Sequence, residues 1–288
     1  MPSLRDIKRK ITSVKKTQQI TKAMKMVAAA KLRRSQERVI AARPYSRKML
    51  AVIASLAARV ERAQHPLLAK REPKRVKLMI LTSDRGLCGA YNTNIIRKAV
   101  EAVREFQAQG KEVRLNIVGR KGRDVFRKRS AYTLGQTWTD LGMIDYNKSA
   151  AVGRNIVEKF TAGETDEVYL LYNEFKSVIQ QKVTLEKLLP VEPPAETDPF
   201  MAAVDYLYEP SAEAILSSIL PKHIEVQLFR ALLESQASEM GARMTAMDSA
   251  TRNAKEMIEK LTLKFNKQRQ AAITKEISEI VGGAEALK

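Results

Sequence analysis

The sequence predicts an α/β protein that combines two long terminal helices, paired in a coiled coil, with a Rossmann-like α/β domain between them. Three observations support this fold class. Residues 3–43 contain no Gly or Pro and repeat apolar residues at helical spacing. Residues 226–265 keep a coiled-coil spacing, and residues 76–188 alternate short apolar runs with amphipathic stretches. The 288 residues, 44% of them hydrophobic, are ordinary for a folded chain.

The first helix is predicted from a spacing of three and four residues. Ser3 and Asp6 form a capping-box pattern at its start, with a carboxylate at the positive helix end. Pro44 is compatible with a second helical stretch, a bend or a break. The apolar positions that carry the spacing are Leu4, Ile7, Ile11, Val14, Ile20, Met24 and Val27.

The second terminal helix is expected from Pro221 to about Val281. At ~1.5 Å per residue it would be roughly 90 Å long, far beyond an ordinary globular helix. Small and flexible seam residues would allow close packing against the Ala-rich first helix. Its seam consists of Val226, Phe229, Leu233, Ala237, Met240, Met244, Met247, Thr251, Ala254, Ile258, Leu261 and Phe265.

Between these helices the apolar period changes and predicts alternating strands and helices, as in a mainly parallel, layered domain. A Pro-rich stretch then leaves this domain. The predicted strands are 76–82, 113–119, 167–173 and 182–188, and the predicted helices are 92–109, 122–128 and 149–160. The resulting divisions are a first coiled-coil helix over 1–62, an α/β domain over 74–190, a linker over 191–210 and a second coiled-coil helix over 211–288.

Positive charge is concentrated at the start of the chain. Residues 1–75 hold 21 Lys and Arg against 4 Asp and Glu, so their charge of 21 − 4 = +17 accounts for most of the total of +19. Such a stripe attracts an acidic protein surface, nucleic acid or anionic lipid, and charge alone does not choose among them. Tyr45 is the only aromatic residue of this region, which gives little support for a stacking platform.

The sequence gives little support for a disulfide, a zinc site, a membrane-spanning helix or a signal peptide. The single cysteine, Cys88, cannot form an internal disulfide and fits a reducing compartment, and with His65 and His223 it is a poor zinc set. The longest uncharged apolar run, 49–58, is about half of the ~20 residues that span a bilayer. No apolar region follows the basic amino end, so we expect no signal peptide.

The loop Ser83–Ala90 follows the first strand and resembles a phosphate cradle. Its glycines are only three residues apart and no Gly-Lys-Ser/Thr follows, so a structural turn or partner contact is favoured over a nucleotide site. Arg85 would lower the pKa of the Cys88 thiol, but no histidine base is near in sequence, which favours a packed thiol. The acidic residues near predicted strand ends form no acid/base pair and favour structural roles. They are Asp84, Asp124 and Glu174.

Four stretches together resemble the gamma subunits of F-type ATP synthases, and the resemblance covers essentially the whole chain. They are 3–14, 19–30, 82–92 and 265–284, the last with the specific pattern Ile-Thr-x-Glu followed by an acidic residue and Gly-Ala. The resemblance implies an antiparallel coiled coil inside a ring of three alpha and three beta subunits. It also implies an α/β domain that meets the epsilon subunit and the membrane c-ring.

The resemblance further implies a central rotor stalk with no catalytic residue, cofactor or metal of its own. Proton-driven rotation would carry each beta subunit through its states in turn, on the cytoplasmic face of a bacterial inner membrane, with membrane association only through the complex. The chloroplast insertion with paired cysteines is missing, so no thiol switch is expected. The residues expected to contact or couple to partners are Met24, Lys25, Lys31, Arg33, Arg34, Arg243, Gln270 and Thr274.

Two other classes explain parts of the sequence. A basic coiled-coil protein that binds nucleic acid would use the stripe to neutralise phosphates, and its affinity would fall steeply with salt. A small α/β enzyme with dimerising helical ends would need a ligand in the loop 83–92. Only the rotor hypothesis, which involves no nucleic acid, accounts for all four stretches.

Overall fold

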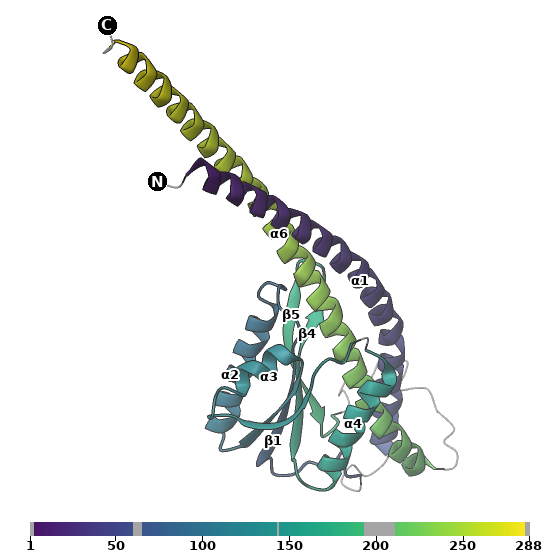
Figure 1. Cartoon of the computed structure of the whole chain (residues 1–288). Coiled ribbons are helices and arrows are strands. Elements are labelled where there is room, and N and C mark those ends of the chain that lie inside the picture. The colour runs from purple at the N-terminus through teal and green to yellow at the C-terminus, as the bar shows by residue number, and fades with distance from the viewer. Residues whose placement is uncertain (1–2, 60–64, 143, 193–210, 286–288) are drawn as a thin grey trace. The chain divides into compact units, whose positions relative to one another are not determined.

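The structure is a computed structural model that describes residues 3–59, 65–142, 144–192 and 211–285 (Figure 1). The chain divides into two compact units, one formed by Met1–Ala28 with Met244–Lys288 and the other by Ala29–Arg243. The predicted linker, 191–210, lies outside the described residues from position 193 onward. The elements are α1 (Leu4–Arg59), β1 (Arg75–Leu81), α2 (Tyr91–Ala108), β2 (Glu112–Val118), α3 (Arg120–Phe126), β3 (Thr133–Trp138), α4 (Tyr146–Thr161), β4 (Glu167–Phe175), β5 (Gln181–Leu189) and α6 (Ala212–Glu285).

A five-stranded sheet in the order β3-β2-β1-β4-β5 organises the second unit. The pairs β1–β2, β1–β4 and β2–β3 are parallel, and only β4–β5 is antiparallel. The short connection between β4 and β5 requires this, because a parallel crossover needs a dozen or more residues. The mainly parallel, Rossmann-like prediction is confirmed. Strand β3 was not predicted, since it lies at the edge and most of its residues are exposed.

Two apolar layers cover the sheet. Alternate residues of β1 point to opposite faces: Leu78 and Ile80 pack with α2 and α3, whereas Met79 and Leu81 pack with α4 and with parts of α1 and α6. Figure 1 shows α2 and α3 on one side of the sheet and α4 on the other. The terminal helices therefore belong to the core of this unit as well as to the coiled coil.

Both terminal helices pass through a proline. Helix α1 continues across Pro44, so the second helix start or break that the sequence allowed does not occur. Helix α6 begins at Ala212, next to the predicted division at 211 and before the periodic stretch that was expected from Pro221. A proline inside a helix costs about 3 kcal/mol. Near Pro221 this cost is offset by packing, because Leu220 and Ile224 are completely buried on either side of it.

The first unit is an antiparallel helix pair. Lys25 of α1 contacts Asp248 of α6, and Thr21 contacts Thr251, so rising numbers on one helix meet falling numbers on the other. Beyond Thr251, the residues of α6 that are not fully exposed follow the predicted seam and extend it by one position. They are Ala254, Ile258, Leu261, Phe265 and Gln268. The predicted two-helix coiled coil is confirmed.

The seam of α1 differs from the prediction after Val14. Ile20 and Val27 are 59% and 56% exposed, so they do not lie on the seam. Thr21 and Ala28 are buried in their place. The reason is geometric: the seam advances by alternating three and four residues, and polar Thr21 occupies a position that apolarity alone did not mark. Its hydroxyl accepts a hydrogen bond from Thr251 at 2.8 Å, which makes burial of a polar group tolerable.

Candidate functional site

The amino end of α1 begins with the predicted capping box. The Ser3 hydroxyl donates to the Asp6 carboxylate at 2.7 Å, and the Asp6 backbone amide donates to the Ser3 hydroxyl at 3.2 Å. The bond from the Ser3 hydroxyl, together with one from the Ser3 backbone amide to the same carboxylate at 3.1 Å, holds the pKa of Asp6 below its ordinary value. The positive helix end thus has its own anion, and the basic residues that follow have no acidic neighbour within the next two turns.

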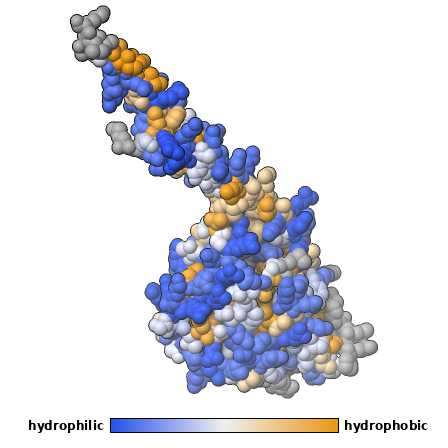
Figure 2. Space-filling view, viewed as in Figure 1, coloured by the Kyte–Doolittle hydropathy of each residue, from blue (hydrophilic) through white to orange (hydrophobic). Residues whose placement is uncertain are grey.

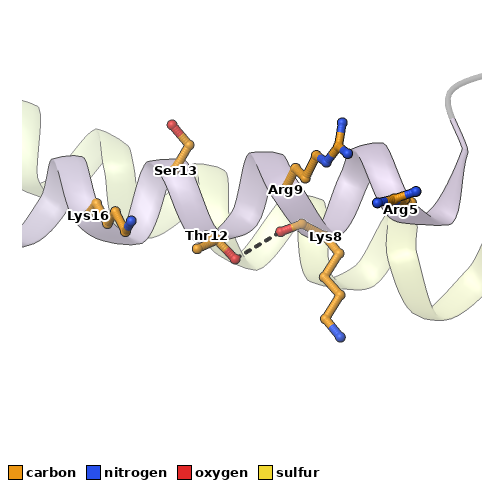
Figure 3. A pocket seen from close by; sticks show the side chains of 6 residues that line it. All are labelled: Arg5, Lys8, Arg9, Thr12, Ser13 and Lys16. Carbon is orange, nitrogen blue, oxygen red and sulfur yellow. Dashed lines mark hydrogen bonds between the residues drawn. The ribbon is translucent and has the colours of Figure 1, made fainter.

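A shallow hollow on this part of α1 carries four cations. Its lining is Arg5, Lys8, Arg9, Thr12, Ser13 and Lys16. Figure 3 shows Lys8 and Arg9 pointing to different sides of the helix, while the Thr12 hydroxyl donates to the Lys8 carbonyl at 3.1 Å. Because these side chains diverge, the hollow is not a closed anion pocket. It is a cationic surface that suits an extended acidic partner.

Four predicted contact residues belong to the helix pair. Met24 is half-buried, and Lys25 forms an ion pair with Asp248 at 2.5 Å. That hydrogen bond lowers the pKa of Asp248. Gln270 and Thr274 are exposed on α6, beyond the last seam residue. The antiparallel pairing places Met24 and Lys25 far from Gln270 and Thr274. Lys25 lies opposite position 248 of α6, and Gln270 is roughly 33 Å further along that helix at about 1.5 Å per residue.

Four other predicted residues belong to the second unit. Lys31, Arg33 and Arg34 are exposed, and Arg33 pairs with Glu37 one helical turn away at 3.2 Å. Arg243 is different, since only 12% of its side chain is exposed. The side chains of the seven predicted contact residues other than Arg243 are at least partly exposed, so a partner could touch them without rearrangement of this chain.

Arg243 is engaged inside the chain. Its guanidinium contacts the Glu239 carboxylate at 2.5 Å, while its Nε has no hydrogen-bond partner. Burial raises the pKa of Glu239, and the Arg243 charge opposes that rise. A buried guanidinium nitrogen without an acceptor costs folding free energy. The Nε of Arg243 is therefore a donor that a further acceptor could satisfy.

Exposed apolar residues form a part of the surface that sequence reasoning missed. Ile20, Met26 and Val27 lie among the cations of α1, where the first and last had been assigned to the seam. On α6, the exposed end carries Ile273, Ile277, Ile280 and Val281, and Figure 2 shows apolar surface near this end of the chain. Their spacing of four and three residues was a readable signal of an apolar helix face.

The loop Ser83–Ala90 is closed by its own hydrogen bonds. The Asn92 amide nitrogen donates to the Ser83 hydroxyl at 2.8 Å and to the Cys88 sulfur at 3.2 Å, and the Ser83 backbone amide donates to the Asn92 carbonyl oxygen. Cys88 is buried, which raises the pKa of its thiol. Leu87 is exposed at φ 63°, an uncommon conformation for a residue other than glycine. These features make a hydrogen-bonded turn with Leu87 on its surface.

The three predicted carboxylates also have local partners. Asp84 accepts hydrogen bonds from the backbone amides of Arg120 and Asp140. Asp124 pairs with the adjacent Arg123, and Glu174 pairs with Lys176. In the described part of the chain, no group of three His, Cys, Asp or Glu residues is placed to hold a metal ion. No helix there is long and apolar enough to cross a membrane.

Comparison with known proteins gives a consistent result. A family model described as ATP synthase matches residues 3–287. ATP synthase gamma chains from Pelotomaculum thermopropionicum and Desulfitobacterium hafniense are 52% and 53% identical over 100% of both chains. A chain of the Tetrahymena thermophila mitochondrial ATP synthase central stalk and c-ring matches at a TM-score of 0.61 and 27% identity, covering 80% of this chain and 99% of that one.

A chain of the Euglena gracilis mitochondrial ATP synthase shares the fold at a TM-score of 0.68 and 22% identity, covering 99% of this chain and 94% of that one. The bacterial relatives match along their whole length, and both the helix pair and the sheet fall within the matched residues. The chain belongs to the ATP synthase gamma chain family.

Proposed function

We propose that this chain is the rotating central stalk of a bacterial F-type ATP synthase. It couples proton-driven rotation of the c-ring to sequential conformational change of the catalytic beta subunits, in synthesis or hydrolysis of ATP. The observation that carries the proposal is the full-length match to bacterial gamma chains. The terminal helices (1–62 and 211–288) act as the shaft, and the α/β body (74–190) meets the epsilon subunit and the c-ring.

The exposed apolar residues at the carboxyl end of α6 support the proposal that partner subunits surround this helix. After Gln268 no residue up to Gly283 is shielded, and this single helix exposes an isoleucine stripe. A lone helix with an apolar face gains its stability from packing against something else. A sleeve formed by the alpha and beta subunits would cover Ile273, Ile277 and Ile280.

The chain acts without catalytic residues of its own. Each orientation of an asymmetric shaft makes different contacts with the three beta subunits, so it stabilises a different conformation in each of them. Lys25, Lys31, Arg33 and Arg34 attract acidic loops of the beta subunits. Met24, Arg243, Gln270 and Thr274 make contacts that differ between orientations, and these differential contacts shift the populations of the beta states.

A purification experiment tests the stalk function. The tagged chain is isolated from its native source at moderate salt, and the mass, subunit ratio and ATPase activity of the material are measured. We expect a complex with alpha and beta subunits in threefold excess over this chain. A free monomer or dimer that carries nucleic acid and has no ATPase activity would refute the stalk and support the basic coiled-coil alternative.

The same material tests membrane attachment. On fractionation of cells we expect the chain in the membrane pellet, with release together with alpha and beta subunits when the sector is stripped from the membrane. Release with the sector is the behaviour of a peripheral subunit, and the cytoplasmic face is part of the proposal. Release of the chain alone, with alpha and beta retained, would contradict attachment through the complex.

A pair of variants separates a coupling role of Arg243 from a structural one. Arg243→Ala removes both the internal ion pair and any partner contact, whereas Glu239→Gln removes only the internal anion. We expect Arg243→Ala to lower ATP hydrolysis several-fold, and Glu239→Gln to remain near wild type. Equal losses would mean that Arg243 serves only to pair with Glu239. For Gln270→Ala, the matched control is Lys267→Ala on the same exposed stretch.

A further inference from the structure

A cavity of about 70 Å³ lies in the second unit at the carboxyl ends of β1 and β2, beside α6. In open α/β sheets this edge is where ligands bind. The loop after β1 contributes Asp84 to its lining, and α6 contributes Ser235 and Glu239. Pockets for ligands of nucleotide size measure at least about 300 Å³, so this cavity is too small for one. It has room for about two groups of the size of water.

The lining of this cavity is acidic. Its carboxylates are Asp84 and Glu239, and among the described residues that form it none is Lys, Arg or His. Burial raises the pKa of Glu239 and the charge of Asp84 raises it further, so the two carboxylates act on each other. The lining therefore favours a positively charged ligand over an anion. The cations that oppose this rise in pKa lie outside the lining and are Arg243, Lys31 and Arg85.

Ser235 brings a buried hydroxyl without a partner to the same lining. The residue is 6% exposed, and its Oγ has no hydrogen-bond partner among the described residues. The neighbouring hydroxyls are engaged: Tyr91 donates to the Ser235 backbone carbonyl at 3.2 Å, and Thr82 donates to the Val118 carbonyl at 2.9 Å. A buried hydroxyl without a partner costs folding free energy, and a bound group that supplies the partner removes this cost.

We propose that this cavity binds a primary ammonium group, which donates its N–H groups to the Asp84 and Glu239 carboxylates and to the Ser235 hydroxyl oxygen. Such a group has three donors and no acceptor, which matches these three acceptors. Arg243 engages Oε1 of Glu239, so the ammonium takes Oε2. The apolar residues of the lining, among them Leu232, suit the carbon that carries the nitrogen.

A divalent metal ion fits this cavity less well. Calcium and magnesium ions take about six or more oxygen ligands. In the described part of the chain, no group of three His, Cys, Asp or Glu residues is placed to hold such an ion. The ammonium group can belong to a free small amine or to a lysine side chain of a partner subunit, because the chemistry of the site is the same for both.

Binding of methylammonium to the full-length chain tests the proposal. Tetramethylammonium, which has the same charge but no N–H group, is the control, and saturation-transfer NMR records the binding of each. We expect saturable binding of methylammonium in the millimolar range, because so small a ligand has limited affinity. Equal binding of the two ions, or no saturable binding of methylammonium, would overturn the proposal.

A pair of serine variants assigns the binding to this cavity. Ser235→Ala removes the hydroxyl that lacks a partner, so the melting temperature should stay the same or rise, while methylammonium binding weakens about tenfold. The matched control is Ser238→Ala, one turn further along α6, which removes a hydrogen bond to the Asn173 carbonyl at 2.9 Å. It should lower the melting temperature and leave binding unchanged. Unchanged binding in Ser235→Ala would overturn the assignment.

The complex purified with alpha and beta subunits distinguishes the two sources of the ammonium group. Methylammonium binding to both the isolated chain and the complex supports a free amine as the ligand. Binding to the isolated chain alone supports a partner lysine that fills the cavity in the complex. Because the isolated chain is measured separately, failure of the stalk proposal and failure of the ammonium site give different results.

Discussion

A buried ion pair joins the two terminal helices within the second unit, and its removal should destabilise the fold. Arg43 of α1 donates to one Glu234 carboxylate oxygen at 3.1 and 2.9 Å, and the Phe175 backbone amide at the end of β4 donates to the other at 3.0 Å. The Glu234 side chain is only 2% exposed, whereas that of Arg43 is 36% exposed. The carboxylate therefore depends on these donors more than the guanidinium depends on it.

The loss of folding free energy depends on which charge of the pair is left without its partner. Arg43→Met keeps most of the apolar stem but leaves a buried carboxylate with a single backbone donor. Loss of one partner of a buried pair costs about 3–5 kcal/mol, and water entering through the exposed side of Arg43 places this case near about 3 kcal/mol. Glu234→Gln keeps an acceptor for the Phe175 amide and leaves Arg43 partly hydrated, so we expect about 2 kcal/mol.

The double variant distinguishes a pair from two separate contributions. If the two side chains act mainly on each other, Arg43→Met with Glu234→Gln costs about 3 kcal/mol, less than the sum of the single changes by about 2 kcal/mol. The control is Arg33→Met in the exposed pair with Glu37, which should change the free energy of unfolding by under ~0.5 kcal/mol.

Urea unfolding followed by tryptophan fluorescence measures these differences. The only tryptophan, Trp138, lies in β3 of the same unit, so the signal reports on that unit and not on the helix pair. The comparison is valid while the slope of free energy against urea stays unchanged. A cost below ~1 kcal/mol for Arg43→Met, or additive single changes, would refute the reasoning.

Three further predictions concern other parts of the chain. Asp248→Ala removes the solvent-accessible pairs with Lys25 and Arg252 and should cost under ~1 kcal/mol by urea unfolding of the coiled coil, followed by circular dichroism. Gly119→Ala should lower the melting temperature strongly, because at φ 96° the added Cβ would lie 2.2 Å from the Thr82 carbonyl oxygen. Gly110→Ala, at φ 75° with open space around it, should cost only about 1 kcal/mol. Equal losses in the two variants would contradict the steric argument. Burial lowers the pKa of His223 to about 4, so the unfolded chain binds its proton first and stability falls as pH drops from about 6.5 to 4; His223→Leu should flatten the melting temperature over this window.

The long-range period of apolar residues was enough to predict most of the fold. Strands β1 and β4 contain runs of three or more apolar residues, β2 alternates apolar with polar residues, and the α6 seam repeats over many turns, so several positions together indicate each element. Strand β3 has no such signal, because it is held by hydrogen bonds to β2 at an exposed sheet edge. The periodic stretch of α6 was read only from Pro221, although the second coiled-coil division was drawn from residue 211, because packing by Leu220 and Ile224 outweighs a local helix breaker.

The sequence was enough to choose the candidate contact residues, but not to predict which of their side chains are buried. Nothing in the sequence around Arg243 distinguishes it from Arg33 or Arg34, yet its side chain is enclosed and theirs are open. The partner Glu239, four residues earlier on α6, can be read from the sequence, but the enclosure of this pair depends on packing that the sequence does not spell out.

The distribution of polar and apolar residues on α1 is what a shaft working inside partners requires. Three hydroxyl residues, Thr21, Ser35 and Ser46, are buried on the side that faces α6, while Ile20 and Val27 are exposed to solvent. A free helix pair would be more stable with these two groups exchanged, because buried apolar area contributes about 25 cal/mol per Å². The arrangement is favourable only if another surface covers the exposed isoleucine and valine. The partners of the proposed stalk would cover this face of α1 and add hydrophobic stabilisation that the isolated chain lacks.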